Sequence, residues 1–431
     1  MPTQELTPVS TSKAVVSVPA VSPWRTMFQS WTYATGAVLP VFLISRFVFV
    51  LLTYLGGVLF FVPNYWPGSL SLHDVLDTWN RWDSTHFADI AIHGYTTLSQ
   101  AAFFPLYPVL ERIPYLILHR GILLIGMTLS NLAFLGTLIV LYRLVETEFD
   151  RPTALRTTLY LAIFPTAMFF FAAYNESLFL FCMLLSIYNM RRGSWWLAGL
   201  FGGLATLTRS VGVFLALIYC CEFTRQCLLP LWSIWHMPIR RTRQLARSLV
   251  ALLNLLPILF IPLALGFYAY ALNVRFHDPL AFVHAQSSWR VGPTFPWIGP
   301  LIALKSILTQ SPFTFVTIHD LIELTALALF LLLIILCFVG PERLKRDQWT
   351  FPLLGLCLLC LPLFFPGLPS PCGLPYDPLP STNRFVLEVF IGFIMLARLG
   401  RRAWFHQSYL LISLPLLAFF TFQFITGHWT V

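Results

Sequence analysis

Residues 121–142 read GILLIGMTLSNLAFLGTLIVLY and contain no charged side chain. A helix of this length matches the ~30 Å hydrocarbon core of a bilayer. Because backbone inside hydrocarbon must satisfy its own hydrogen bonds, such a run predicts a membrane-spanning helix. Comparable apolar runs lie near residues 36–62, 158–174, 177–190, 194–208, 211–223, 249–272, 320–340, 351–366, 385–400 and 408–426. The sequence therefore predicts an all-α polytopic membrane protein with about 10–12 transmembrane helices, the shorter ones tilted, broken or re-entrant.

The composition excludes most soluble classes. The chain has 431 residues, of which 57% are hydrophobic and 10% are charged, whereas soluble domains carry about 25% charged residues. The formal net charge is +9, but the basic residues form short clusters between apolar runs, which is typical of membrane topology. We therefore expect a lipid bilayer and no nucleic acid as partner. We also expect no cofactor, because no Walker A, GxGxxG or HExxH motif is present.

The basic residues orient the predicted helices. If the N-terminal tail is cytoplasmic and the spans alternate, 18 of the 27 Lys and Arg residues face the cytoplasm, one (Arg46) lies in the first helix and 8 face the other side. Those eight are Arg81, Arg112, Arg120, Arg209, Arg275, Arg290, Lys305 and Arg384. The long segments 63–120, 273–319 and 367–384 then become external loops. We expect residues 1–35 to form a disordered cytoplasmic tail, and residues 36–431 to form a single transmembrane domain.

The first external segment holds the densest group of reactive side chains, between Asp77 and Tyr95. If residues 82–92 are helical, one side of that helix carries Asp83, His86, Asp89 and His93. Asp83 could be a general base, with an aromatic wall of Trp79 and Trp82 for a sugar or lipid phosphate. The Asp/His spacing could instead bind a metal, or the helix could lie at the membrane interface with its tryptophans at headgroup level. Spacing alone leaves all three interpretations open.

Four further polar positions have both a structural and a functional interpretation. Glu176, after Asn175, is either a first-turn acid of a helix or a group that lines a site. Arg209 interrupts an apolar stretch, where its natural partner is a carboxylate or a phosphate. Asp278 precedes a proline and could simply cap a turn. Arg384 begins an apolar helix, whose N-terminus together with this arginine could hold a phosphate.

An enzyme on the external side would lack nucleotide sugars and ATP. It would need an activated donor delivered within the membrane, such as a polyprenyl-phosphate sugar. An aspartate base, arginines for the phosphate and aromatic walls suit that donor. The alternative is a transporter or lipid flippase, for which we would expect an internal repeat with paired broken helices. No convincing repeat is present, and the polar first external loop favours an enzyme.

A series of motifs is similar to a known family. These motifs are Arg81–Phe87 with Gly94–Tyr95, Ala102–Pro108, Ile163–Pro165, Ala172–Phe179, Leu207–Gly212, Asp278–Phe282 through Trp289, and Ser381 with Arg384–Phe385. In this order they resemble the PIG-V family of mannosyltransferases, which includes GPI mannosyltransferase 2 and bacterial relatives. The compact chain looks like the bacterial relatives.

The resemblance implies a GT-C type glycosyltransferase with a large first external loop and an inverting mechanism. The implied donor is polyprenyl- or dolichyl-phosphate mannose, the acceptor is a glycolipid or lipid-linked molecule, and the linkage is α-1,6. The implied location is the bacterial plasma membrane with an external active site, or the endoplasmic reticulum membrane in a eukaryote. Asp83 matches the essential aspartate of the first external loop, and no metal ligand is expected. We expect substrate-binding roles for Arg81, Trp82, His86, Glu176, Arg209, Asp278, Ser381 and Arg384.

Overall fold

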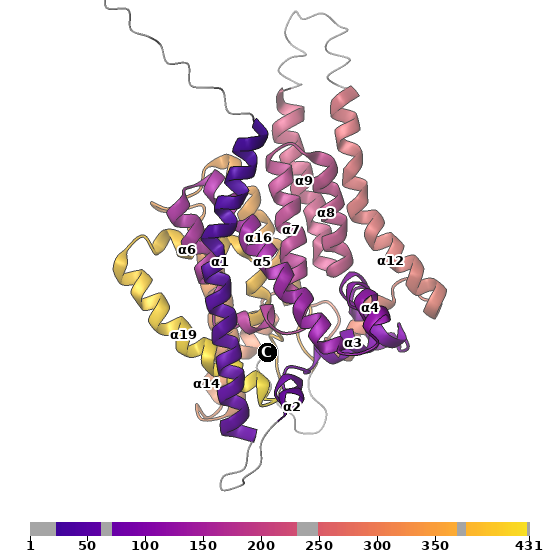
Figure 1. Cartoon of the computed structure of the whole chain (residues 1–431), viewed down its shortest axis with the longest axis vertical. Coiled ribbons are helices and arrows are strands. Elements are labelled where there is room, and N and C mark those ends of the chain that lie inside the picture. The colour runs from indigo at the N-terminus through magenta and orange to yellow at the C-terminus, as the bar shows by residue number, and fades with distance from the viewer. Residues whose placement is uncertain (1–22, 62–70, 231–248, 369–375, 429–431) are drawn as a thin grey trace, which may run out of the picture.

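The computed structural model describes residues 23–61, 71–230, 249–368 and 376–428, and within these ranges it contains helices and one isolated β-bridge. Figure 1 shows their arrangement. The α-helices are α1 (Pro23–Gly56), α2 (Leu72–Asp77), α3 (Asp83–His93), α4 (Leu106–Leu118), α5 (Ile122–Glu148), α6 (Arg151–Ala162), α7 (Glu176–Arg191), α8 (Trp195–Thr208), α9 (Leu215–Phe223), α12 (Phe260–Phe276), α13 (Ala281–His284), α14 (Ile298–Thr309), α15 (Phe315–Leu336), α16 (Thr350–Cys360), α17 (Thr382–Phe385), α18 (Phe390–Leu399) and α19 (Ala403–Ile425).

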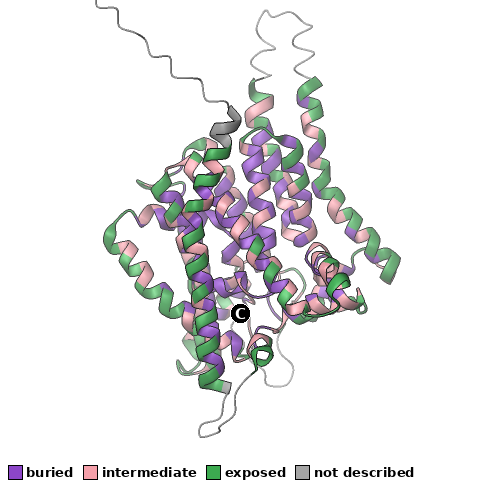
Figure 2. Ribbon diagram, viewed as in Figure 1, coloured by how far each residue is buried: buried purple, intermediate pink, exposed green. Residues whose placement is uncertain are grey.

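Seven helical segments among the described residues are long and apolar enough to cross a membrane. They are Phe28–Phe60, Ile122–Glu148, Ser210–Leu228, Leu249–Phe276, Phe315–Leu336, Arg346–Phe364 and Ala403–Ile425. Large apolar side chains such as Phe47, Phe267 and Leu411 remain exposed on the outer faces of these helices, which is what a lipid-facing surface requires. The exposed outer faces of α1, α12 and α19 are visible in Figure 2. The prediction of an all-α polytopic membrane protein is confirmed.

The core surrounds α7, which packs against α5 and α8. Nearly every residue of α7 is buried, as expected of a helix that is apolar on all sides. Two glycines let α8 lie very close to the chain at Pro257 and Phe260, where α12 begins. A Cβ at Gly199 would lie 2.1 Å from the carbonyl oxygen of Pro257, and one at Gly203 would lie 2.8 Å from that of Phe260. This spacing of two glycines is typical of tightly packed membrane helices.

Two of the predicted spans are broken helices. The run 158–174 splits into α6 and a 3₁₀ turn, Ala167–Phe170, because Pro165 can neither donate a backbone hydrogen bond nor fit within a continuous helix. The run 385–400 splits into a 3₁₀ turn, Val386–Glu388, and α18. The two irregular regions touch, since the Thr166 hydroxyl donates to the carbonyl of Asn383 at 2.8 Å. Such backbone is tolerated at membrane depth where protein buries it.

The first helix begins earlier than predicted. α1 begins at Pro23 rather than near residue 36, so residues 23–35 extend the first helix. A proline is favoured in the first turn of a helix. Trp31 also packs edge-on against Tyr188, with ring centroids 5.3 Å apart, and this contact anchors the extension to α7. Residues 1–22 lie outside the described part of the chain.

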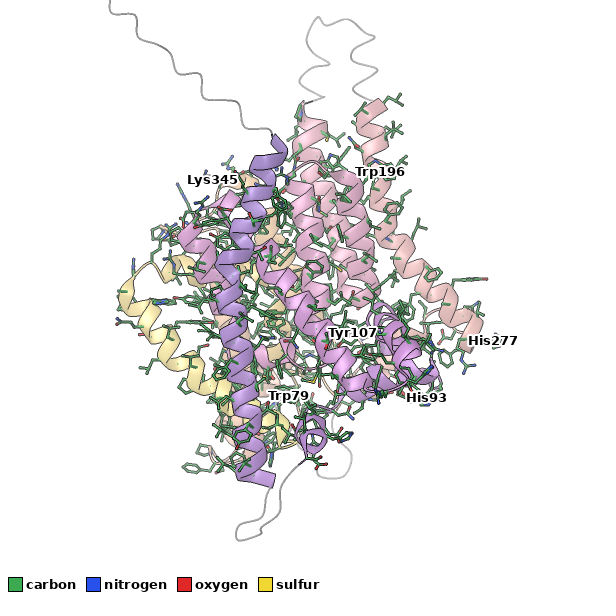
Figure 3. The ribbon with its side chains drawn as sticks, in the orientation of Figure 1. Trp79, His93, Tyr107, Trp196, His277 and Lys345 are labelled. Carbon is green, nitrogen blue, oxygen red and sulfur yellow. The ribbon has the colours of Figure 1, made fainter. Side chains whose placement is uncertain are left out.

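The two ends of the helical bundle carry different charge networks. At the end predicted to be cytoplasmic, Arg191 binds Glu148 at 2.7 Å and Glu222 at 3.1 Å. Glu222 also accepts hydrogen bonds from Arg225 and Thr350. Figure 3 shows Lys345 and Trp196 toward this end, and Trp79, His93 and His277 toward the opposite one. The predicted cytoplasmic residues Arg240, Arg241, Arg243 and Arg247 lie outside the described residues.

This network predicts a graded effect on stability. The Glu222 side chain is 1% exposed and its removal leaves Arg191 without one of its buried partners, so Glu222→Ala should lower the free energy of unfolding by about 3–5 kcal/mol. Asp347 binds the same arginine at 3.3 Å but is 45% exposed, so Asp347→Ala should cost less than about 1 kcal/mol. Denaturant titration of the purified variants in micelles measures both. Equal losses would contradict a buried network centred on Glu222.

Candidate active site

Asp83 is the first residue of α3, and an unusual backbone turn positions it. The preceding residue, Trp82, has φ 45° and ψ −113°, a conformation that costs energy for a bulky residue and persists only when its surroundings enforce it. The Trp82 ring packs against Phe424 of α19, with centroids 5.1 Å apart. The Arg81 carbonyl accepts a hydrogen bond from the Tyr174 hydroxyl at 3.1 Å. The end of α19 and Tyr174 therefore fix the start of α3.

Arg81 itself points away from the charged groups described below. Its guanidinium donates to the carbonyls of Thr78 and Ile425, each at 3.3 Å. Arg81 and Trp82 were both predicted to bind substrate, and the structure places both against the C-terminal helix. These contacts hold the turn before Asp83, and substrate binding by the two residues stays a prediction.

Glu176 and Arg209 meet because two helix ends are tied together. The Asn175 side chain donates to the carbonyl of Thr208 at 3.0 Å, which links the start of α7 to the end of α8. Arg209 follows α8 in extended conformation, and its guanidinium contacts Glu176 at 3.1 Å and also Glu388. The chain then turns back tightly at Gly212, where a Cβ would lie 2.6 Å from the backbone nitrogen of Thr206. Arg209 thus has the carboxylate partners that its position in an apolar stretch predicted.

Arg384 joins this pair to the first external segment. Its guanidinium contacts Asp83 at 2.7 Å and also Glu176. Ser381 sets up the turn before it, with φ 66° and a carbonyl that accepts from the backbone nitrogens of Arg384 and Phe385. Burial lowers the pKa of the Arg384 guanidinium, but the carboxylates of Asp83 and Glu176 outweigh this effect and raise it. The backbone of Ser381 therefore shapes the turn that carries Arg384, and its predicted contact with substrate stays a prediction.

These residues form one charge cluster, which we define as Asp83, Glu176, Arg209, Arg384 and Glu388. The Glu176 side chain is fully buried, whereas that of Asp83 is 27% exposed. Buried charges are tolerated only when they are paired, and here carboxylates and guanidiniums alternate along a chain of contacts. Asp83 is the most exposed carboxylate of the cluster and is the one that an incoming molecule can reach.

Arg290 also belongs to the site. From the sequence it was only one of eight external basic residues and was not predicted to bind substrate. It donates to the carbonyl of Phe365 at 2.8 Å and to that of Pro380 at 3.2 Å. Arg209 and Arg290 both lie over the ring of Phe385, at 5.0 and 5.5 Å from its centroid. Burial and the charges of Arg209 and Arg384 lower the pKa of Arg290 to about 10, despite the opposing effect of Asp377. Within the described residues, Arg290 makes no ion pair with a carboxylate.

The aromatic wall differs from the predicted one. Trp79 is fully buried and its ring nitrogen donates to the Thr53 hydroxyl at 3.0 Å, so it belongs to the core and cannot face a substrate. The Trp79 ring packs between Phe49 of α1 and Phe424 of α19, and burying so large a ring stabilises the fold more than leaving it in an exposed loop would. His86 instead stacks on Phe103, with centroids 4.7 Å apart, and Phe103 meets Trp289 edge-on at 6.1 Å. This row of rings runs from the helix of Asp83 to the neighbour of Arg290.

The structure does not bring together the metal ligands considered on α3, and Asp278 has no contact with the charge cluster among the described residues. Asp89 pairs with His93 at 2.8 Å and accepts from Gln100, while Asp83 binds Arg384, so the side chains of Asp83, His86 and Asp89 have separate partners. Asp278 accepts from the backbone nitrogen of Leu280 at 2.9 Å and binds His284 at 2.6 Å. Both contacts lie within the turn that contains Asp278, in agreement with the capping interpretation.

Among solved structures, the chain is similar to ArnT from Cupriavidus metallidurans bound to undecaprenyl phosphate, with a TM-score of 0.46 and 13% identity over 86% of this chain and 62% of that one. It is also similar to the oligosaccharyltransferase of Archaeoglobus fulgidus, with a TM-score of 0.44 and 12% identity over 90% of this chain and 56% of that one.

Curated relatives match a shorter stretch at higher identity. GPI alpha-1,6-mannosyltransferase 2 of Mus musculus is 34% identical over 144 residues, which cover 31% of this chain and 29% of that protein. GPI mannosyltransferase 2 of Drosophila pseudoobscura pseudoobscura is 35% identical over 129 residues, or 28% of each chain. The matched stretches thus span less than a third of the length of these two relatives.

The match to a family profile is much longer. The profile described as Mannosyltransferase (PIG-V) matches residues 51–334, which is more than half of the chain. The matched range includes Asp83, Glu176, Arg209 and Arg290. Beyond its end, Arg384, which binds Asp83, and Glu388, which binds Arg209, complete the charge cluster. The chain belongs to the PIG-V mannosyltransferase family.

Proposed function

We propose that this membrane mannosyltransferase moves mannose from a polyprenyl- or dolichyl-phosphate donor to a hydroxyl of a glycolipid acceptor, at its extracytoplasmic face. The observation that carries the proposal is the contact of Arg384 with both Asp83 and Glu176. A partly exposed aspartate beside buried arginines supplies both groups that the transfer needs. Those groups are a base for the acceptor and cations for the departing phosphate.

The transfer is a single displacement at C1 of mannose. Asp83 accepts the proton of the acceptor hydroxyl while the hydroxyl oxygen forms its bond to C1. The bond between C1 and the phosphate oxygen breaks, and its electron pair leaves with the lipid phosphate. One displacement inverts the configuration at C1, so a β-linked donor gives an α-linked product. The GT-C type mechanism and the α-1,6 linkage remain proposals that follow from the family.

Donor binding and base activation are coupled in this scheme. Arg384 holds Asp83 at 2.7 Å in the structure. A phosphate offers this guanidinium another anion with matching geometry. Donor binding at Arg384 therefore frees Asp83 to accept the proton. Arg290 is the arginine best suited to meet the phosphate first, because its described partners are neutral carbonyl oxygens.

Asp83→Asn tests the base. The amide cannot accept the proton, so mannose transfer from polyprenyl-phosphate mannose to a glycolipid extract should fall by about 10²–10⁴-fold. Binding of polyprenyl phosphate should not weaken, because the variant removes a competing anion from Arg384. Radiolabelled transfer and ligand binding are measured on the same purified protein.

The matched control for this test is Asp77→Asn, which alters an exposed aspartate of the same external segment and should keep its activity. Full activity of Asp83→Asn would remove Asp83 as the base. Solute movement in proteoliposomes without any glycosyl transfer would favour the transporter alternative.

Arg290→Gln tests phosphate recognition. Loss of a charged donor to a phosphate costs about 1.5–3 kcal/mol, so the donor KM should rise by about 10–100-fold, with a smaller change in kcat. Arg275→Gln is the matched control, since Arg275 is an external arginine that donates to the carbonyl of Tyr95 at 2.8 Å. Steady-state kinetics with varied donor separates the two. An unchanged donor KM in Arg290→Gln would exclude this arginine from the phosphate site.

A further inference from the structure

A second group of ionisable side chains lies where α15 begins and meets the third external segment. His319, Asp320 and Asp377 each offer a ligand atom, and these atoms lie within 4.8 Å of one another. Glu323 follows one turn later on the same helix, with Oε1 at 3.9 Å from the imidazole Nε2 of His319. The proposed mannosyl transfer uses none of these four residues.

Their buried polar atoms lack partners. Within the described residues, both carboxylate oxygens of Asp320, Nε2 of His319, Oε1 of Glu323 and Oδ2 of Asp377 are buried and make no hydrogen bond. His319, Asp320 and Glu323 are each more than nine-tenths buried. Buried ionised carboxylates are costly unless a cation or a proton neutralises them, and a bound cation would also give these unpartnered atoms a ligand.

We propose that His319, Asp320 and Asp377 bind a divalent cation, with Glu323 as a fourth ligand. One imidazole nitrogen with several carboxylate oxygens suits Mn²⁺ or Zn²⁺. Ligand atoms at about 2.1 Å from a tetrahedral ion lie about 3.4 Å apart. Ion binding would therefore draw these side chains, whose ligand atoms now lie within 4.8 Å of one another, closer together by up to about 1.4 Å. These ligands differ from the Asp83, His86 and Asp89 combination considered from the sequence.

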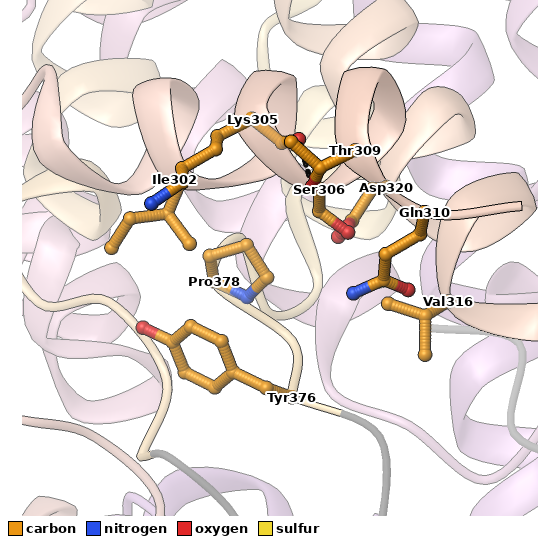
Figure 4. Close-up of a pocket in the computed structure, with 9 residues that line it drawn as sticks. All are labelled: Ile302, Lys305, Ser306, Thr309, Gln310, Val316, Asp320, Tyr376 and Pro378. Carbon is orange, nitrogen blue, oxygen red and sulfur yellow. Dashed lines mark hydrogen bonds between the residues drawn. The ribbon is translucent and has the colours of Figure 1, made fainter.

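A cavity lies beside the proposed site. It has a volume of about 380 Å³, and Asp320, Ser306, Lys305 and Tyr376 are among its lining residues. Figure 4 shows Asp320 beside Ser306 on one wall, with Tyr376 and Pro378 opposite. Asp320 therefore belongs to both the cavity wall and the ligand group. None of the five residues of the charge cluster lines this cavity.

The cation would also steady the active site. The Oε2 atom of Glu323 accepts the backbone N–H of Asn383 at 2.6 Å, and Asn383 directly precedes Arg384. Asp377 lies on the same external segment, six residues before Asn383. An ion that joins α15 to Asp377 therefore fixes the segment that carries Arg384. Glu323 is a positioning residue in this scheme. The cation site does not depend on the proposed function; only its effect on transfer does.

Metal binding to the purified full-length protein tests the site. After chelator treatment, the protein should take up Mn²⁺ at one site, and electron paramagnetic resonance should detect coupling to a histidine nitrogen. Asp320→Asn and His319→Gln should each weaken Mn²⁺ binding by at least about 100-fold, and His319→Gln should abolish the nitrogen coupling. Zn²⁺ should displace Mn²⁺ from the wild-type protein.

Controls locate the ion and separate it from catalysis. Asp77→Asn and Asp89→Asn should bind Mn²⁺ as the wild type does, and Asp83→Asn should bind it while lacking transfer activity. No Mn²⁺ or Zn²⁺ uptake by the wild type, or undiminished binding by Asp320→Asn and His319→Gln, would overturn the proposal. Loss of binding in Asp89→Asn would do the same by assigning the ion to α3. If the ligand variants fail to fold, absence of nitrogen coupling in the wild-type spectrum overturns it alone.

Discussion

The contact of Arg384 with Asp83 and Glu176 joins three parts of the chain that are distant in sequence. Asp83 comes from the first external segment, Glu176 from the start of the central helix α7, and Arg384 from the segment before α18. A guanidinium can hold two carboxylates at once because it is planar and presents five donors. Its burial makes the arrangement demanding, since loss of any one partner leaves an unpaired charge inside the protein.

The irregular backbone around the site follows from this requirement. If residues 158–174 and 382–399 formed continuous helices, Thr166 and Asn383 would lie within regular helix rather than at breaks. The breaks after α6 and before α18 bring Thr166 and Asn383 into contact instead, and Arg384 follows directly. The strained turn at Trp82 likewise positions Asp83, at the start of α3, where it contacts Arg384. Local strain and broken helices thus accompany the placement of these charges, as is common at functional sites where surrounding protein buries the irregular backbone.

The sequence predicted the helical membrane fold because continuous apolar runs have a single physical explanation. It also selected Glu176, Arg209 and Arg384. Arg209 was selected because a charge in an apolar stretch is costly without a partner, Glu176 as a polar group at a helix start, and Arg384 because it could hold a phosphate together with a helix N-terminus. Their meeting point was not predictable, because it depends on which helices break. The same cost argument applies to Glu388 and to Asp320 and Glu323 within the run 320–340, and would have drawn attention to them. Trp79 was misread because nothing in the sequence shows that this loop residue packs between α1 and α19.

The most direct test of the central claim is the stereochemistry of a single transfer. Purified protein is given a polyprenyl-phosphate β-mannose and a glycolipid acceptor, and the product and the released lipid phosphate are quantified. We expect an α-linked mannose in the product, assigned by nuclear magnetic resonance, with one polyprenyl phosphate released for each mannose transferred. A β-linked product would contradict a single displacement assisted by Asp83. Absence of transfer from every lipid-phosphate mannose, with transfer from a soluble nucleotide sugar, would contradict the donor assignment itself.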